Sequence, residues 1–224
     1  MDKSYLTFLR QLRANNNRPW FQAHKAQFDA LREQWLTELG QLIAHCSEWE
    51  PRYKWLSAKE CTYRIYRDTR FSPDKTPYKT YFSAAISPKG RTSDVAGYYI
   101  TSGLDPAHTG LYGGLWCPDA QALRKMRHAI VDNIEEWEEI VNEPRLRELY
   151  PHWCDLGRAL KTAPKGWPKD HPQIEYLRLL DYGREHVVAP EYFTDPAWPE
   201  HAAATLQPLN PLLDFINYSL FEEE

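Results

Sequence analysis

One stripe of apolar residues, repeated at three- and four-residue intervals, constrains the fold of this chain more than any other feature. The stripe begins at Phe21 and ends at Cys46, which predicts a helix of roughly seven turns that starts at Pro19. His24 lies on the same face, and we expect it to be a core histidine whose ring nitrogens find hydrogen-bond partners. A helix of this length needs a sheet or several other helices to cover its apolar face.

The segments after this helix have the composition of β-strands. They are rich in Tyr, Ile, Thr, Val or Trp and are bounded by Pro, Gly or Asp, which predicts strands at about 61–67, 78–87, 95–102 and 109–116. Turn residues between neighbouring segments favour an antiparallel meander. Asp119 is a predicted cap for a helix from 120 to about 132, and residues 161–173 form a Pro- and Lys-rich loop. A short helix and an extended piece are expected within 174–190.

We therefore predict an α+β fold, with an antiparallel meander sheet of about four or more strands and long helices packed mainly on one face. The chain has 224 residues, of which 42% are hydrophobic and 14% aromatic, so it can bury a sizeable core. It contains no internal repeat and no long linker, which predicts a single domain over 1–224. Four widely spaced cysteines, no signal-peptide pattern and no long apolar run predict a cytoplasmic protein that does not enter the membrane.

A short basic stretch in the middle of the chain is the strongest candidate for a site. Six basic and three acidic residues lie between Lys59 and Lys79, so this window carries +3 in a chain whose formal charge is −4. It is expected to form a strand, a long ordered loop and a second strand. Alternation along the first strand places Arg64, Tyr66 and Asp68 on one face. Guanidinium groups beside aromatic rings can hold a phosphate or a carboxylate.

The candidate residues follow from this interpretation. Anion binding is assigned to the basic and aromatic side chains of the stretch, namely Arg64, Tyr66, Arg67, Arg70, Lys75 and Lys79. Asp68 or Asp74 would orient the ligand or act as a base. A second candidate lies in the 161–173 loop, where Lys161 and Lys165 would complete an anion pocket and His171 would act as acid or base. The alternative for that loop is a solvated surface segment.

A purely structural interpretation of the central stretch also remains open. Arg64 with Asp68, and Arg67 with Asp74, could neutralise each other and staple the loop to the sheet. Sequence patterns that would identify a reaction are missing: no G-x-x-x-x-G-K-[ST], G-x-G-x-x-G or G-x-S-x-G motif occurs. No metal site is predicted, because His152 and Cys154 are too sparse for zinc, and the cofactor is unknown from the sequence.

The chain resembles a bacterial and fungal family of proteins without an assigned activity, domain-of-unknown-function family 2461. The resemblance spans nearly the whole chain and is carried by Asn15–Phe21 near the start, Tyr63–Ser72 and Asp74–Lys79 in the centre, and Asp170-His171-Pro172 near the end. It implies a single full-length domain in which the central stretch is the signature. It supplies no catalytic residue.

Two functional hypotheses follow. The first is an anion-binding protein or an enzyme that handles a small phosphorylated or carboxylate ligand at the 63–79 stretch. The second is a non-enzymatic module that binds nucleic acid or a protein, with aromatic side chains as stacking platforms and a structural Arg/Asp motif. The acidic net charge argues against nucleic acid, because affinity for a polyanion requires phosphate neutralisation.

Overall fold

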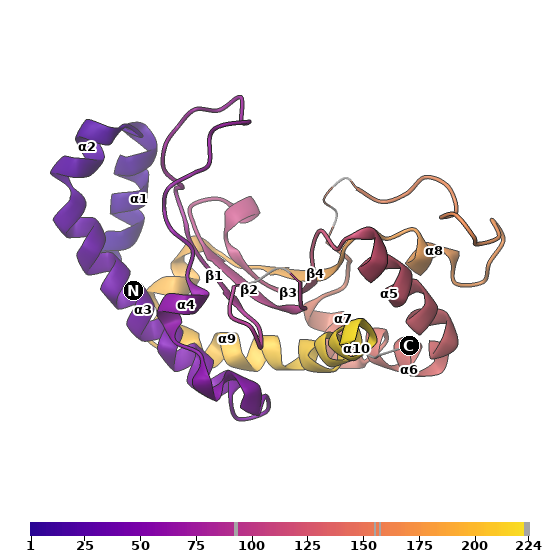
Figure 1. Cartoon of the computed structure of the whole chain (residues 1–224). Coiled ribbons are helices and arrows are strands. Elements are labelled where there is room, and N and C mark those ends of the chain that lie inside the picture. The colour runs from indigo at the N-terminus through magenta and orange to yellow at the C-terminus, as the bar shows by residue number, and fades with distance from the viewer. Residues whose placement is uncertain (92–93, 155, 157, 222–224) are drawn as a thin grey trace. The chain divides into compact units, whose positions relative to one another are not determined.

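The structure is a computed structural model that describes residues 1–91, 94–154, 156 and 158–221, and its class is α+β as predicted (Figure 1). The chain divides into two compact units. Unit 1 comprises Met1–Arg91, Tyr99–Leu111 and Val187–Thr205, and unit 2 comprises Thr92–Tyr98, Tyr112–His186 and Leu206–Glu224. A single domain over the whole chain stays a prediction.

The sheet has the predicted meander topology. Its strands are antiparallel and hydrogen-bond in chain order: β1 (Phe82–Ile86), β2 (Gly97–Ser102), β3 (Gly110–Leu115) and β4 (Tyr182–Val187). The strands at 95–102 and 109–116 were predicted to within two residues at each end. The extended piece expected within 174–190 is the fourth strand.

The first predicted strand, at about 61–67, is wrong as a regular strand. Ser57 and Glu60 form a reciprocal capping box that begins the short helix α4 (Ala58–Cys61). After it, residues 62–67 run as an irregular arm beside 77–84, joined by isolated bridges at Thr62 and Tyr66. Because Thr62 pairs with Ala84 and Tyr66 with Tyr78, the second side has more residues than the first between the two bridges, which interrupts the ladder, and β1 begins only at Phe82.

In unit 1, the predicted long helix is divided in two. Helix α1 (Ser4–Ala14) is followed by α2 (Arg18–Ala23) and α3 (Lys25–Cys46), with the break at His24. The His24 backbone leaves the helical region (φ −108°, ψ 12°), and its ring stacks on Trp20 and hydrogen-bonds the Trp20 carbonyl through Nδ1 at 2.8 Å. The histidine is therefore satisfied, as predicted, but it separates two helices.

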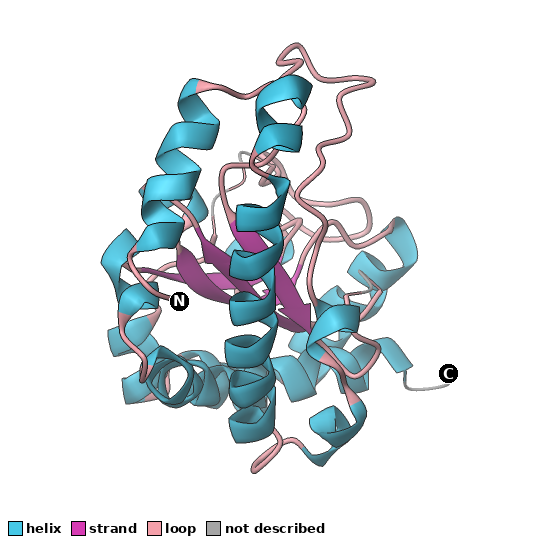
Figure 2. Cartoon of the chain, turned by 90° about the vertical axis from the view of Figure 1, so that its left-hand side faces the viewer, coloured by secondary structure: helices cyan, strands magenta, loops and turns pink. Residues whose placement is uncertain are grey.

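The apolar face of α3 packs against β1 and the arm. Figure 2 shows this helix crossing in front of the sheet. Phe28 stacks on Phe82 of β1 with ring centroids 6.0 Å apart. Trp35 is fully buried and donates its indole N–H to Thr62 Oγ1 at 2.8 Å. The contact with Thr62 fixes the start of the arm against the core. Unit 1 also contains η1 (Pro51–Trp55), η2 (Pro106–His108) and η3 (Pro190–Thr194), and most of α9 (Trp198–Leu206).

Unit 2 is built around the buried Trp137. Its helices are α5 (Ala120–Asp132), α6 (Ile134–Val141), α7 (Pro144–Leu149), α8 (Ile174–Leu177) and α10 (Asn210–Phe221), with η4 (Gln207–Leu209) before the last. Asp119 caps α5 as predicted, accepting from the Ala122 N–H at 2.8 Å. The Trp137 ring contacts those of Trp153, Tyr182 and Phe215. Among the residues described, no helix has the length and apolar character needed to span a membrane.

Candidate functional site

The central basic stretch forms a hairpin-like arm in unit 1. Backbone hydrogen bonds pair its two sides at single positions, from the Arg67 N–H to the Pro77 carbonyl at 2.9 Å and from the Lys79 N–H to the Ile65 carbonyl at 2.8 Å. Ile65 is 5% exposed and Tyr66 is 45% exposed, so the alternation expected from the sequence holds on this side of the arm. The residues between, 68–76, form the long loop.

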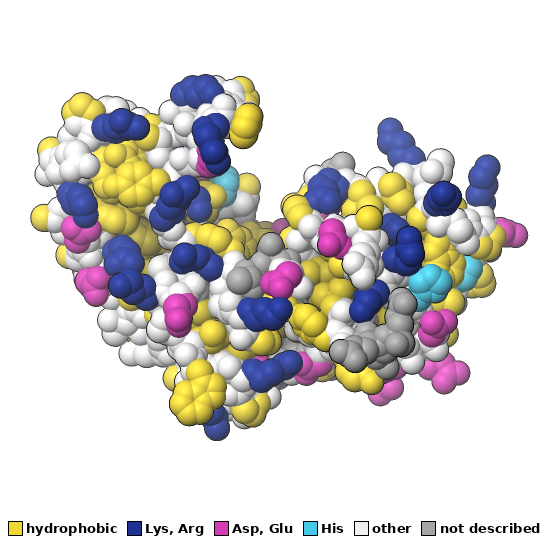
Figure 3. Space-filling view, viewed as in Figure 1, with side chains coloured by type: hydrophobic (Ala, Val, Ile, Leu, Met, Phe, Trp, Pro, Cys, Tyr) yellow, Lys and Arg dark blue, Asp and Glu magenta, His cyan; other side chains and the backbone are white. Residues whose placement is uncertain are grey.

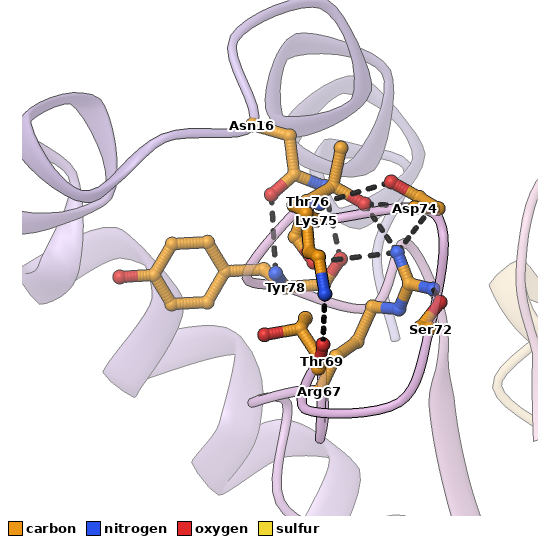
Figure 4. A network of polar contacts seen from close by, with 8 residues as sticks. All are labelled: Asn16, Arg67, Thr69, Ser72, Asp74, Lys75, Thr76 and Tyr78. Atoms are coloured by element: carbon orange, nitrogen blue, oxygen red, sulfur yellow. Dashed lines mark hydrogen bonds and ion pairs between the residues drawn. The ribbon is translucent and has the colours of Figure 1, made fainter.

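Arg67 is the centre of a polar network that holds this loop closed (Figure 4). Its guanidinium forms an ion pair with Asp74 and hydrogen-bonds the Thr76 hydroxyl and the Thr76 carbonyl, the last at 3.3 Å. The Asp74 carboxylate also accepts from the Thr76 backbone N–H and hydroxyl, each at 2.9 Å. Hydrogen bonds from Thr76 and Arg67 lower the pKa of Asp74 to about 2. The predicted Arg67–Asp74 staple is therefore present.

Asp68 is paired with Arg70, not with Arg64 as the structural interpretation predicted. Its carboxylate accepts from Arg70 Nε at 3.0 Å and Nη2 at 2.7 Å, and also from the Arg70 backbone N–H at 3.2 Å. These hydrogen bonds lower the pKa of Asp68 to about 2. The chain turns at Asp68, so its side chain meets the residue two positions ahead.

The tip of the loop, between the Arg67–Asp74 and Asp68–Arg70 pairs, exposes the aromatic side chain of Phe71. Lys75 donates to the Thr69 carbonyl at 2.9 Å, which closes the base of the tip (Figure 4). Phe71 is 94% exposed. In the space-filling view, Lys and Arg side chains gather on the part of unit 1 formed by this loop and the helices beside it (Figure 3). The loop therefore presents a basic, partly aromatic surface on a rigid support.

Asn16 anchors the arm from the link between α1 and α2, a role that sequence reasoning missed. Its side-chain amide donates to the Tyr78 carbonyl at 2.9 Å and accepts from the Tyr78 N–H at 3.1 Å (Figure 4). The Tyr78 ring in turn stacks on Phe21 of α2 with centroids 4.0 Å apart. From the sequence, Asn16 was only one of three helix-breaking asparagines, because a pairing across 62 positions leaves no local pattern.

Among the described residues, three cations of the 63–79 stretch form no ion pair with a carboxylate: Arg64, Lys75 and Lys79. Lys75 is held by the Thr69 carbonyl, whereas Arg64 and Lys79 lie close to each other. The Lys79 ammonium lies 5.2 Å from the ring centroid of Tyr63 and 5.6 Å from that of Tyr81. Burial lowers the pKa of Lys79, and the nearby positive charge of Arg64 lowers it further. A recess of about 20 Å³ lies beside Arg64, and Arg32, Tyr63 and Tyr81 also line it, whereas Lys79 is not among its lining residues.

The remaining predicted residues lie in unit 2. Lys161 and Lys165 are both exposed, and Lys165 lines a cavity together with residues of α5. His171 accepts from the Gln173 N–H at 3.2 Å through Nδ1 and meets Trp167 edge to face at 5.1 Å. Their joint action with the arm of unit 1 stays a prediction, as does a catalytic role for His171.

Metal chemistry finds no support in the part of the chain that is described, where no three His, Cys, Asp or Glu side chains gather as ligands. The site is thus made of guanidinium, ammonium, hydroxyl and aromatic groups. Such groups can bind an anion, stack on a ring and exclude water, and they supply no redox chemistry.

Fold and site together define a small α+β protein with a stapled basic arm. The chain belongs to the conserved hypothetical protein family DUF2461, whose model matches residues 4–215. The family resemblance seen in the sequence is therefore confirmed. No curated protein and no solved structure matches the chain.

Proposed function

We propose that this protein binds a small ligand through a terminal phosphate or carboxylate group, held by Arg64 and Lys79 of unit 1. The observation that carries the proposal is a pair of neighbouring cations, neither of which forms an ion pair with a described carboxylate, although the charge of Arg64 is felt by Asp68. Two like charges beside each other, one of them half-buried, destabilise the folded protein. An anion placed between them removes that repulsion and offsets the desolvation of Lys79.

The size of the recess supports a small anionic group as the part that is bound. About 20 Å³ is close to the space of a single water-sized probe. An oxygen of a phosphate or carboxylate group fits such a space, and the remainder of the ligand would lie outside it. The rings of Tyr63 and Tyr81 flank the recess, so the anion would sit where water is partly excluded.

The contacts also narrow the predicted roles. Arg67 and Arg70 each have a carboxylate and hold the loop, so we assign them to support. Asp68 and Asp74, with pKa values of about 2, are weak bases at neutral pH, which disfavours the acid–base role proposed for them. Tyr66 and Lys75 stay candidates for contacts to the rest of the ligand. The proposal is therefore one of binding, and a reaction is not part of it.

One observation favours the alternative, a module that binds a macromolecule. Phe71 is almost fully exposed at the tip of a loop that is held closed on both sides of it. An aromatic side chain on a rigid loop can anchor a protein partner or stack on a base. Replacing Phe71 with Ser would then abolish partner binding and leave small-anion binding unchanged, which separates the two functions.

Titration with inorganic phosphate, sulfate and acetate, measured by calorimetry, tests the main proposal. Loss of a charge-assisted hydrogen bond is worth roughly 1.5–3 kcal/mol, so Arg64→Ala should weaken binding by about ten- to 150-fold. Arg10→Ala is the matched control, since it removes one exposed positive charge on α1 of the same unit. Equal affinity in all three proteins, or no binding by the natural chain, would refute the proposal.

A further inference from the structure

A second cavity, contained entirely in unit 2, lies between α5 and the 161–173 loop. It measures about 600 Å³ and is lined by Ala120, Arg124, Arg127, His128, Lys165, Gly166 and Trp167. Figure 1 shows the loop leaving the region of α5 and returning at α8. A volume of this size is in the range of small-molecule sites, which run from about 300 to 1,000 Å³.

The charge of the lining is of one sign. Three of its side chains are cationic, Arg124, Arg127 and Lys165, and none is acidic. Within the described part of the chain, no ion pair joins any of the three to a carboxylate. A concave surface with cations and no counter-charge concentrates anions, because the walls are of low dielectric constant.

Arg127 is held in place without being neutralised. Its Nε donates to the Leu177 carbonyl at 2.8 Å and its Nη2 is 3.4 Å from the Leu179 carbonyl, so two backbone oxygens of the α8 region orient the guanidinium. Neither acceptor carries a formal charge. A rigid, half-buried guanidinium that keeps its charge is a preorganised partner for phosphate.

The other wall of the cavity is aromatic. The rings of His128 and Trp167 lie 5.2 Å apart, and the His171 ring meets that of Trp167 edge to face. Apart from its two chain neighbours, Gly166, at φ +94°, has no atom within 4 Å of the position a Cβ would take, so the loop backbone is open at this point. Figure 3 shows His side chains on this face of unit 2 with Lys and Arg side chains beside them. A flat ring can stack here.

We propose that this cavity binds a phosphate ester that carries a flat ring, the class to which nucleoside monophosphates belong. The phosphate would lie against Arg124, Arg127 and Lys165, and the ring against Trp167. This site is separate from the one proposed around Arg64, and it uses no residue of unit 1. Sequence reasoning found only Lys165, because α5 and the loop are about forty residues apart in the chain.

Calorimetry with AMP, adenosine and inorganic phosphate tests the two halves of the site. AMP should bind at least about tenfold more tightly than either part alone, since base stacking is worth roughly 5- to 150-fold in affinity. Lys165→Ala and Arg124→Ala, both at exposed positions, should each weaken AMP binding by about tenfold or more. Trp167→Leu should weaken AMP binding and leave phosphate binding unchanged.

The controls separate a built site from general attraction. Lys169→Ala removes the same charge from the same loop, outside the cavity lining, and should leave the AMP affinity unchanged. Arg64→Ala should also leave it unchanged, so a failure of one proposed site does not affect the other. Equal losses in Lys165→Ala and Lys169→Ala, adenosine binding as tightly as AMP, or no AMP binding at millimolar concentration would each overturn the proposal.

Discussion

In the loop of unit 1, the guanidinium groups of Arg67 and Arg70 each have a carboxylate of their own. Two guanidinium groups of unit 2, those of Arg184 and Arg127, instead lie against carbonyl oxygens or a ring. Arg184 is 5% exposed, donates to the Tyr150 carbonyl at 2.8 Å and lies 4.0 Å from the centroid of the Trp153 ring. Arg127 has two backbone acceptors in the same way. Both units use arginine to fix the backbone, with opposite consequences for local charge.

The difference shows where charge remains available for a ligand. In the loop, Arg67 and Arg70 are each paired with a carboxylate within a few residues, so the positive charge that remains is that of Lys75, which is held by a carbonyl. In unit 2, carbonyl dipoles and ring faces hold the cation without cancelling it, and the charge persists where burial makes it expensive. Burial accordingly lowers the pKa of Arg184 to about 10.

The largest expected effect on the free energy of unfolding is at Arg184, the buried cation that is held by a carbonyl and a ring. Arg184→Ala should lower the free energy of unfolding by about 2–4 kcal/mol, because it leaves a cavity and removes the donor from the buried Tyr150 carbonyl. Urea denaturation followed by tryptophan fluorescence measures it. Arg178→Ala is the control, since Arg178 pairs with an exposed Glu175 and should cost no more than about 0.5 kcal/mol. Equal midpoints for the two variants would break the comparison.

The second prediction concerns the neutral anchor of the arm. Asn16→Ala should lower the free energy of unfolding by about 1–3 kcal/mol, since the backbone N–H and carbonyl of Tyr78 lose their partners together. Asn15→Ala provides the reference, because the Asn15 side chain donates only to the exposed Gln11 carbonyl. A smaller decrease in the free energy of unfolding for Asn16→Ala than for Asn15→Ala would show that the arm does not need the Asn16–Tyr78 hydrogen bonds to stay folded.

The third prediction tests the matched pair at Asp74. Asp74→Asn should increase the rate of chymotrypsin cleavage after Phe71 severalfold, because the loop loses its ion pair while the unit stays folded. The carboxylate also gives a pH dependence. Its pKa falls from 3.8 to about 2 on folding, so its contribution is complete above pH 3.8 and is lost as the pH falls through about 2. The titration of the Asp74 carboxyl group can be followed through its NMR chemical shift. A titration midpoint near pH 3.8 in the folded protein would contradict the lowered pKa.

The smallest effect is expected at Arg70. Its side chain is 77% exposed and that of Asp68 is 47% exposed, so solvent and salt screen the pair. Arg70→Gln should leave the urea midpoint unchanged within error and raise the cleavage rate after Phe71 less than Asp74→Asn does. A larger increase than that of Asp74→Asn would show that the outer pair, and not Arg67, controls the loop.

Much of the fold could be predicted from local patterns. The capped helix at 120–132 and the meander strands follow from Asp119, from the turn residues and from strand composition. The division of the long helix at His24 could not, since the apolar period continues through the break. It depends on the stacking of His24 on Trp20, a contact that a hydrophobic stripe does not encode.

The candidate site shows a similar limit. The Arg67–Asp74 pair was predicted as a structural staple, but the partner of Asp68 was not, because strand alternation was extended past the point where the chain turns. The count of surplus charge was right for the stretch and could not say which cations stay unmatched. Whether a cation lacks a carboxylate depends on distant contacts. Lys79 lies over the ring of Tyr81, and in unit 2 Arg127 is bound by carbonyl groups some fifty residues away in the chain.

The ties within the loop join residues no more than nine positions apart. A ten-residue segment closes in roughly 10–100 ns, and short-range closure demands little chain entropy. During synthesis on the ribosome, residues 67–76 can therefore reach their final hydrogen bonding as soon as they emerge, more than a hundred residues before β4 has been translated. The hydrogen bonds within this loop therefore do not depend on any strand of the sheet having been made.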